Sequence, residues 1–239
     1  MLAFTVVEEI FVNSIYSSYG FALAFIGLVT FPTLGAVLGR KSGNNKNLRI
    51  ILEVSGLVFV TRIALIPFPV RVLELAVSLP AIYTVIMAVV VFYLIFRNIP
   101  LDQIKLSRGT KSLPLQLSLG LIGVPLGVIE YEILKPKALS LGSNPVTNEI
   151  YLVVVMLLFV GVTEELLFRG LLTNYLNRVM PQWLSFHISS LFFGLFHIGY
   201  LNPFEMLFAY AAGVLFSYLM IKTGSLTSPI LDFPLFNNF

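Results

Sequence analysis

The sequence contains no cysteine and very few charged residues, and both shortages restrict what the protein can be. The absence of Cys among 239 residues excludes disulfide bonds, zinc held by thiolates, iron–sulfur clusters and catalysis by a thiol. Only 11% of the residues are charged, whereas roughly a quarter are charged in a soluble domain. With 57% hydrophobic residues, the chain cannot cover a core with polar surface. The composition therefore excludes disorder and a soluble α/β fold, and predicts a polytopic membrane protein.

Hydropathy along the chain predicts seven to eight membrane helices. A bilayer core of about 30 Å requires about 20 apolar residues in a helix, and only helices satisfy their backbone polar groups within one segment. The segments suited to this are 19–39, 48–68, 75–96, 113–134, 150–172, 183–199 and 203–222. A last apolar stretch, 226–239, is too short to cross fully, and 1–18 is expected to be interfacial or partly inserted. We therefore predict one all-α membrane domain over 1–239, a helical bundle.

The distribution of Lys and Arg predicts how this bundle is oriented. Ten basic residues lie in the connections after the first, third, fifth and seventh segments: Arg40, Lys41, Lys46, Arg49, Arg97, Lys105, Arg108, Lys111, Arg178 and Lys222. The opposite connections contain three: Arg71, Lys135 and Lys137. Cytoplasmic connections of membrane proteins are enriched in Lys and Arg, so we expect the first group in the cytoplasm and the N-terminus outside. The net charge of +3 is thereby explained without nucleic-acid binding.

Small residues and isolated charges within the segments are interpreted as structural. Gly35-x-x-x-Gly39 permits two helices to approach closely. A charged side chain in an apolar segment costs about 3 kcal/mol or more, so each one needs a reason. Glu53 and Arg62 are isolated in the second segment, where a partner on another helix or extension to the membrane interface explains them.

The fifth segment carries three charges within six residues, Glu164, Glu165 and Arg169. Adjacent side chains on an α-helix point about 100° apart, so the two glutamates cannot share one face. Glu165 precedes Arg169 by four residues, which is the favourable order for an ion pair. Glu164 is left without a local partner, and a carboxylate in a low-dielectric site suits a group that accepts and returns a proton. The alternative is that all three form one buried salt-bridge network between helices.

The sixth segment contains both histidines, His187 and His197. A lone His in an apolar helix is more often a core residue, but the charged cluster on the preceding segment makes His197 a candidate catalyst. His187 lies near the cytoplasmic end and is interpreted as structural or interfacial. Measured from the predicted cytoplasmic ends, Glu164, Asn237 and His197 lie about 12, 16 and 21 Å deep. These depths are consistent with one layer on the cytoplasmic side.

Several mechanisms of hydrolysis lack the residues that they need. The His-Glu-x-x-His pattern of zinc peptidases is absent, although zinc held by Glu164, His197 and another oxygen ligand stays open. The two aspartates, Asp102 in a loop and Asp232, do not supply a pair within the membrane segments. A Gly-x-Ser-x-Gly elbow is missing as well. What remains is activation of water by a glutamate and a histidine, with amide donors that bind the oxyanion.

These residues resemble the signature motifs of the CPBP family, which contains the type II CAAX prenyl endopeptidases and the bacteriocin-processing and abortive-infection-like membrane proteins. The corresponding motifs are Glu164-Glu165-x-x-x-Arg169, Phe193-x-x-x-His197 and a C-terminal x-x-x-Asn237. The resemblance covers about 150–239, whereas 1–149 is similar only in hydropathy. It implies an intramembrane glutamate endopeptidase, a helical bundle open to the cytosol with its catalytic core at 150–239.

The resemblance also implies roles for individual residues. Glu164 and His197 would activate the attacking water, and Asn237 would form one half of the oxyanion hole. Three motif residues would support the site: Glu165, Arg169 and Phe193. The substrate would be a peptide or protein, in the CAAX branch a prenylated Cys-aliphatic-aliphatic-x tail from which three residues are removed. No cofactor is expected, and the protein would lie in the plasma or cell membrane with its site toward the cytoplasm.

One position departs from the family pattern. The third motif is usually His-x-x-x-Asn, and Phe233 occupies the place of the histidine. Phe cannot donate a hydrogen bond, and loss of one oxyanion donor costs about 100- to 1000-fold in other hydrolases. Another donor could substitute, for which Tyr210 and His187 are candidates. Two functions therefore stay open: an endopeptidase, supported by the three catalytic candidates, and a non-catalytic membrane scaffold or immunity protein, supported by Phe233.

Overall fold

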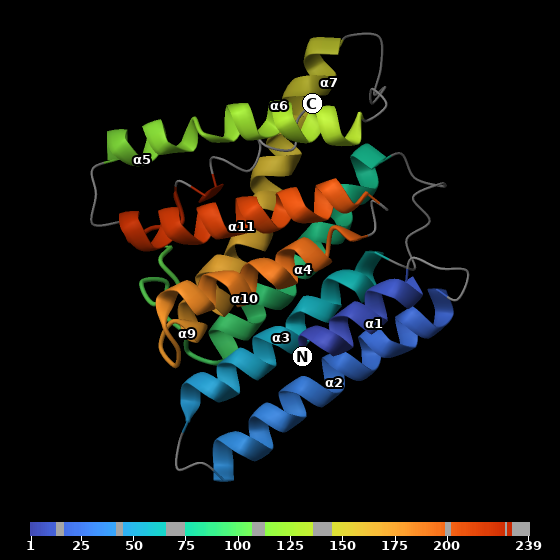
Figure 1. The fold of residues 1–239 in the computed structure, drawn as a ribbon, viewed down its shortest axis with the longest axis vertical. Coiled ribbons are helices and arrows are strands. Elements are labelled where there is room, and N and C mark those ends of the chain that lie inside the picture. The colour runs from blue at the N-terminus through green and yellow to red at the C-terminus, as the bar shows by residue number, and fades with distance from the viewer. Residues whose placement is uncertain are drawn as a thin grey trace. The chain divides into compact units, whose positions relative to one another are not determined.

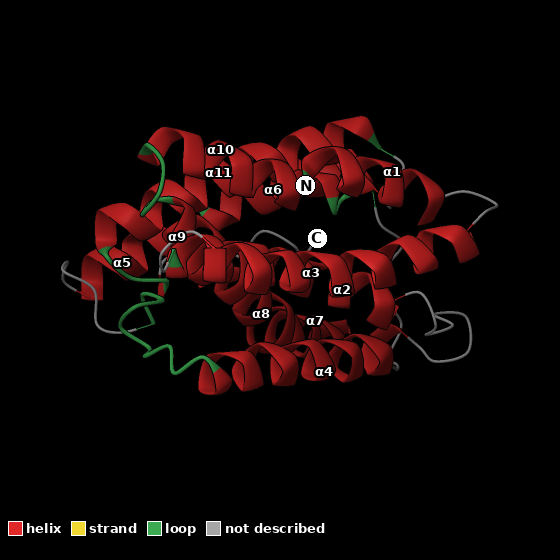
Figure 2. Ribbon diagram, turned by 90° about the horizontal axis from the view of Figure 1, so that it is seen from below, coloured by secondary structure: helices red, strands yellow, loops and turns green. Residues whose placement is uncertain are grey.

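The computed structural model describes residues 1–12, 17–41, 45–65, 75–106, 113–135, 145–198, 202–227 and 229–230. Within these ranges every regular element is a helix and no strand occurs (Figure 2). The predicted all-α class is therefore confirmed. The predicted number of membrane helices is not confirmed, because two of the described helices, Ser18–Gly39 and Pro203–Thr223, are long and apolar enough to cross a bilayer.

Two compact units make up the chain, and each combines segments that are far apart in the sequence. The first unit contains Met1–Pro67 and Leu167–Leu215, and the second contains Phe68–Leu166 and Phe216–Phe239. The chain therefore passes from one unit to the other three times. The single membrane domain over 1–239 stays a prediction.

Three helices form the amino-terminal part of the first unit: α1 (Leu2–Val12), α2 (Ser17–Lys41) and α3 (Lys46–Leu65). They lie side by side, with α2 packed along α3 and α1 against α2 (Figure 1). The predicted close approach at Gly35 and Gly39 is confirmed. A Cβ atom built at Gly35 would lie 3.0 Å from the backbone oxygen of Arg49, and one at Gly39 would lie 3.2 Å from the Cβ of Arg49. Larger residues there would push α2 away from α3.

Aromatic rings attach α1 to the other two helices. Phe4, Phe31 and Phe59 come from α1, α2 and α3, and their ring centroids are 5.7 Å apart in each pair. Phe31 and Phe59 are stacked, and Phe4 meets both of them edge-on, which are arrangements that the ring quadrupoles favour. Glu8 and Glu9 of α1 are buried as well. One face of α1 is therefore buried against the first unit, while Val7 and Ile10 on another face are exposed.

The first unit also contains α9 (Asn174–Leu176), α10 (Gln182–Leu195) and the start of α11 (Pro203–Thr223). The helix α10 is shorter than the predicted segment 183–199, because it ends at Leu195 and a turn follows at Phe196 and His197. Its 14 residues span about 21 Å. The helix α11 begins where the Oδ1 atom of Asn202 accepts a hydrogen bond from the backbone nitrogen of Phe204, at 3.0 Å.

The predicted fifth segment, 150–172, is part of a continuous helix whose pitch changes along its length. The successive stretches are α7 (Pro145–Val155), the π-helix η1 (Met156–Gly161), α8 (Val162–Glu164), the π-helix η2 (Glu165–Thr173) and α9. In a π-helix the backbone hydrogen bonds join residues five apart. Such stretches are rare in proteins overall, but where they occur they often lie at functional sites. Side chains four residues apart therefore do not lie directly above one another in η1 and η2.

The second unit is built around α4 (Leu75–Phe96), which packs against α7, η1 and α8. The predicted fourth segment, 113–134, is divided into α5 (Leu113–Gly120) and α6 (Gly123–Leu134). Pro125 explains the break, because it has no N–H and its ring would clash with the carbonyl four residues earlier. The connection after α4 is attached to the end of α11, where the backbone nitrogen of Leu226 donates to the oxygen of Lys105 at 2.9 Å.

Candidate active site

The first motif lies at the junction of α8 and η2. Glu164 is the last residue of α8, and Glu165 begins η2, which also contains Arg169. Glu165 and Arg169 are buried, and Glu164 is half-buried. The expected Glu165–Arg169 ion pair assumed the 3.6 residues per turn of an α-helix, whereas η2 is a π-helix, which has more residues in each turn. This ion pair therefore stays a prediction.

Glu164 has a hydrogen-bond partner from a distant part of the sequence. Within the second unit, the hydroxyl of Tyr83 on α4 donates to Oε1 of Glu164 at 2.6 Å. Tyr83 is buried, so its hydroxyl lies in an environment of low polarity, where a bond to a carboxylate is strong. Sequence reasoning did not identify Tyr83. The available signal was a tyrosine in an apolar segment that also contains Tyr93, and neither residue indicates a partner.

Within the first unit, Arg169 of the first motif meets Phe193 of the second. The guanidinium carbon of Arg169 lies 4.2 Å from the centroid of the Phe193 ring, and both side chains are buried. The ring of Phe168, beside Arg169 in the sequence, meets Phe193 edge-on at 5.2 Å. The hydroxyl of Ser189 also donates to the backbone oxygen of Phe168 at 3.0 Å and thus joins α10 to η2. A cation–π contact thus joins Arg169 to Phe193, and the supporting role expected for Phe193 in the site stays a prediction.

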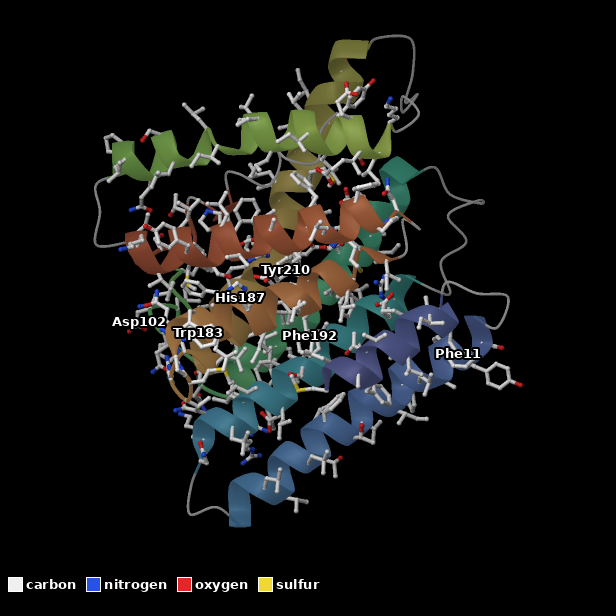
Figure 3. The ribbon with its side chains drawn as sticks, in the orientation of Figure 1. Phe11, Asp102, Trp183, His187, Phe192 and Tyr210 are labelled. Atoms are coloured by element: carbon white, nitrogen blue, oxygen red, sulfur yellow. The ribbon has the colours of Figure 1, made fainter. Side chains whose placement is uncertain are left out.

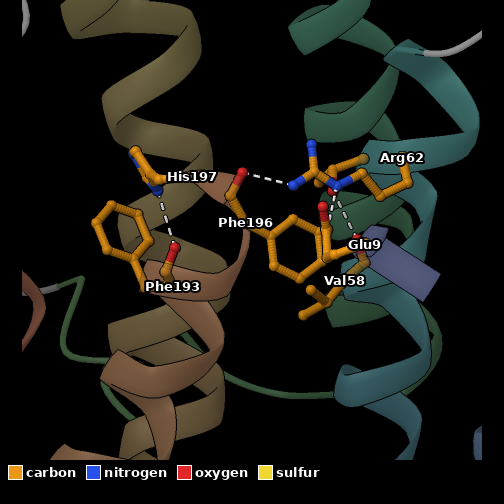
Figure 4. A network of polar contacts seen from close by, with 7 residues as sticks. Glu9, Val58, Arg62, Phe193, Phe196 and His197 are labelled. Atoms are coloured by element: carbon orange, nitrogen blue, oxygen red, sulfur yellow. Dashed lines mark hydrogen bonds and ion pairs between the residues drawn. The ribbon is translucent and has the colours of Figure 1, made fainter. Parts of the chain in front are cut away.

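His197 is held by the backbone of the same motif. Its Nδ1 atom lies 2.8 Å from the backbone oxygen of Phe193, and the two rings are 4.7 Å apart (Figure 4). A carbonyl oxygen can only accept a hydrogen bond, so Nδ1 carries the proton. In the neutral ring the basic nitrogen is then Nε2. The four-residue spacing of the second motif places the carbonyl of the first residue within reach of the histidine.

Arg62 has the interhelical partner that its burial requires. Its Nε atom lies 2.5 Å from Oε1 of Glu9 on α1, and its Nη2 atom lies 2.5 Å from the backbone oxygen of Phe196 (Figure 4). The guanidinium also lies over the Phe196 ring, 4.5 Å from its centroid. The interpretation of Arg62 as a residue paired with another helix is therefore confirmed. Sequence reasoning did not connect it to Glu9 or to the turn that contains His197.

The second histidine forms a separate contact on α10. The Nδ1 atom of His187 lies 2.6 Å from the hydroxyl oxygen of Tyr210 on α11, and the two rings are stacked (Figure 3). The ring of Trp183 meets His187 at 6.3 Å. Close to this contact, a Cβ atom built at Gly194 would lie 3.0 Å from the Cβ of Tyr210. The two residues considered as substitute donors therefore bind each other and join α10 to α11.

The remaining expectations about the site stay predictions. Asn237 and Phe233 lie outside the residues that the structure describes. Glu164 belongs to the second unit and His197 to the first, so their joint action on water is a prediction as well. In the described part of the chain, no group of three or more His, Asp and Glu side chains could hold a metal ion.

Comparison with known proteins agrees with the motifs. The model of the family described as type II CAAX prenyl endopeptidase Rce1-like matches residues 146–238. This range begins in α7 and includes all three motifs. The predicted resemblance is therefore confirmed for this part of the chain. No curated protein and no solved structure matches the chain significantly.

Proposed function

We propose that this protein is an intramembrane endopeptidase of the CAAX-processing type, in which Glu164 and His197 activate a water molecule. The match over residues 146–238 supports the class of enzyme. The observation that carries the mechanism is the contact of His197 Nδ1 with the Phe193 oxygen, at 2.8 Å. Because this contact leaves Nε2 as the basic nitrogen, the histidine has the tautomer that a base needs.

In the proposed reaction, the water oxygen attacks the carbonyl carbon of the scissile peptide bond while Glu164 accepts a proton. Nε2 of His197 accepts a hydrogen bond from the same water and directs its lone pair toward the carbonyl. The C–N bond then breaks, and the proton on Glu164 passes to the leaving amine, which regenerates the carboxylate. The Tyr83 hydroxyl, 2.6 Å from Glu164 Oε1, would keep the other carboxylate oxygen turned toward the water.

The oxyanion of the tetrahedral intermediate would be bound by Asn237. Phe233 cannot contribute a second side-chain donor, so we expect a slow enzyme rather than an inactive one. The enzyme would act at the cytoplasmic side of the membrane, which is supported by the ten basic residues on the predicted cytoplasmic connections. The expected substrate is a protein tail with a prenylated Cys-aliphatic-aliphatic-x end.

The test uses the purified protein in lipid vesicles and a farnesylated peptide that ends in Cys-Val-Ile-Met. We expect release of the tripeptide Val-Ile-Met, measured by mass spectrometry, and slower release from the same peptide with an unmodified cysteine. Glu164→Gln and His197→Gln should abolish release, whereas His187→Gln should retain it. A folded wild-type protein that releases no tripeptide from either peptide would contradict the proposal and favour the non-catalytic scaffold.

The same assay examines the expected absence of a metal. Glutamate and histidine can activate water without an ion, so release should continue in the presence of a chelator. Loss of release in the chelator that returns on addition of zinc would overturn this expectation.

A further inference from the structure

A buried arginine holds the turn that presents His197. Arg62 lies on α3, and its guanidinium reaches the backbone oxygen of Phe196, the residue that directly precedes His197 (Figure 4). Phe196 is the C-cap of α10, where a carbonyl has no partner within its own helix. Arg62 supplies that partner and lies over the ring of the same residue. One side chain therefore contacts Phe196 at two places.

The contact acts on His197 through the peptide bond. The carbonyl of Phe196 and the backbone N–H of His197 belong to one peptide unit, which is planar. Arg62 binds the oxygen of this unit, which belongs to Phe196. The nitrogen of the unit, which belongs to His197, donates a hydrogen bond to the backbone oxygen of Gly194 at 3.0 Å. The plane is thus fixed at both ends. Since the Cα atom of His197 lies in this plane, the direction in which the ring leaves the backbone depends on Arg62.

The arginine is itself fixed by α1. Its Nε atom contacts Oε1 of Glu9, a side chain that is completely buried. A guanidinium presents several donors in a rigid fork, so it can bind the carboxylate and the carbonyl at the same time. Lysine has one compact charge and cannot reproduce this geometry.

We propose that Arg62, anchored by Glu9, is a positioning residue for His197. The inference rests on the proposed function, in which His197 directs the attacking water. The amino-terminal half of the chain lies outside the match at 146–238. By this inference it contributes to the catalytic site. An interhelical ion pair without this role would stabilise the fold and leave the imidazole unchanged.

The activity test compares Arg62→Gln with Arg49→Gln in the vesicle assay, with the farnesylated Cys-Val-Ile-Met peptide. Arg49 is a matched control, because it also lies on α3 and pairs with a glutamate, Glu53, at 2.9 Å. We expect Arg62→Gln to lower kcat by about 10- to 100-fold with little change in KM, since a misdirected group affects the reacting geometry. Arg62→Lys should restore only part of this loss, and Arg49→Gln should leave kcat unchanged.

A second measurement does not depend on activity. The chain contains two histidines, so ¹⁵N labelling of histidine gives two sets of ring signals, and His187→Gln identifies the set of His197. We expect Arg62→Gln to shift and broaden the His197 signals and to leave those of His187 in place. If Arg62→Gln does not fold, Glu9→Gln with Arg62→Gln removes both buried charges and gives the same test.

The two measurements separate this inference from the proposed function. Unchanged His197 signals in the folded Arg62 variant would overturn the positioning role, whatever the activity. An equal loss of kcat in the Arg62 and Arg49 variants would also overturn it. A wild-type protein without peptidase activity, whose His197 signals still respond to Arg62→Gln alone, would support the positioning of His197 and refute the proposed function.

Discussion

The hydroxyl of Tyr83 lies 2.6 Å from Oε1 of Glu164, although the two residues are 81 positions apart. The contact joins α4 to α8 within the second unit. A carboxylate that receives a hydrogen bond from a buried phenol loses rotational freedom and keeps its other oxygen in a defined direction. Glu164 is therefore oriented by a helix that none of the three sequence motifs includes.

Tyr83→Phe is expected to lower kcat by about tenfold, with little change in KM, because it removes this orientation and keeps the ring. Steady-state kinetics on the farnesylated peptide measure both constants. Tyr93→Phe is the control, because Tyr93 lies on the same helix and is also buried. Equal kcat values for the wild type and Tyr83→Phe would show that the contact has no part in the reaction.

Glu164 and Glu165 are expected to differ in their effects. Glu164→Gln should reduce the rate by at least about 1000-fold, because the amide cannot accept the proton of the attacking water. Glu165→Gln should mainly lower the melting temperature, because loss of the predicted ion pair would leave the buried charge of Arg169 uncompensated. Rates and melting curves of both variants test the division, and equal residual activity in the two would refute it.

Phe193→Leu is expected to destabilise the protein more than Phe192→Leu. Both rings are buried on α10, but the Phe193 ring also lies against the Arg169 guanidinium. A desolvated cation–π contact is worth about 2 kcal/mol, so the difference should be about 1–2 kcal/mol. Thermal unfolding of the two variants in the same detergent measures it. Equal melting temperatures would mean that the contact between the two motifs contributes no stability.

Glu8→Gln is expected to stabilise the protein at alkaline pH and not at acidic pH. Burial raises the pKa of the Glu8 carboxyl to about 8 from its usual 4.5, and the neighbouring Glu9 adds to the shift while Arg62 opposes it. Between these values the folded protein retains a proton that the unfolded chain releases, so wild-type stability falls as the pH rises from 4.5 to 8. Glutamine cannot ionise, so the stability of the variant does not fall over this pH range for this reason.

The measurement is the melting temperature at both ends of that range. At pH 8.5 we expect Glu8→Gln to melt roughly 2–6 °C above the wild type, and near pH 4.5 the two should coincide. Glu132→Gln, which changes an exposed glutamate on α6, should show no such dependence. A constant difference between Glu8→Gln and the wild type across the range would contradict the prediction.

Phe233→His is expected to raise kcat by up to roughly 100-fold, because it would restore the histidine of the third motif, an oxyanion donor four residues before Asn237 in the sequence. KM should change little, since the donor acts on the tetrahedral intermediate. Pro234 could misdirect the new side chain, so Phe233→His with Pro234→Ala is measured as well. No gain in either variant of an active enzyme would mean that another group fills this position.

Some features of the protein follow from local properties of the sequence. The all-helical class was predicted from low charge and long apolar segments, because a helix satisfies its backbone polar groups within one segment. The motif residues were also identifiable, since charges in apolar segments are costly and require a reason. The spacing of Phe193 and His197 is likewise local, because it joins a carbonyl and a ring one helical turn apart.

Other features depended on the tertiary structure. The pitch of η2 and the early end of α10 were not predicted, because hydropathy measures the apolar length of a segment and not its hydrogen bonding. The partners of Glu164 and Arg62 were not predictable either, since Tyr83 and Glu9 come from other helices. A buried charge requires a partner, and the sequence shows which charges lie in apolar segments and therefore need one. Only the packing of the helices decides which side chain is that partner.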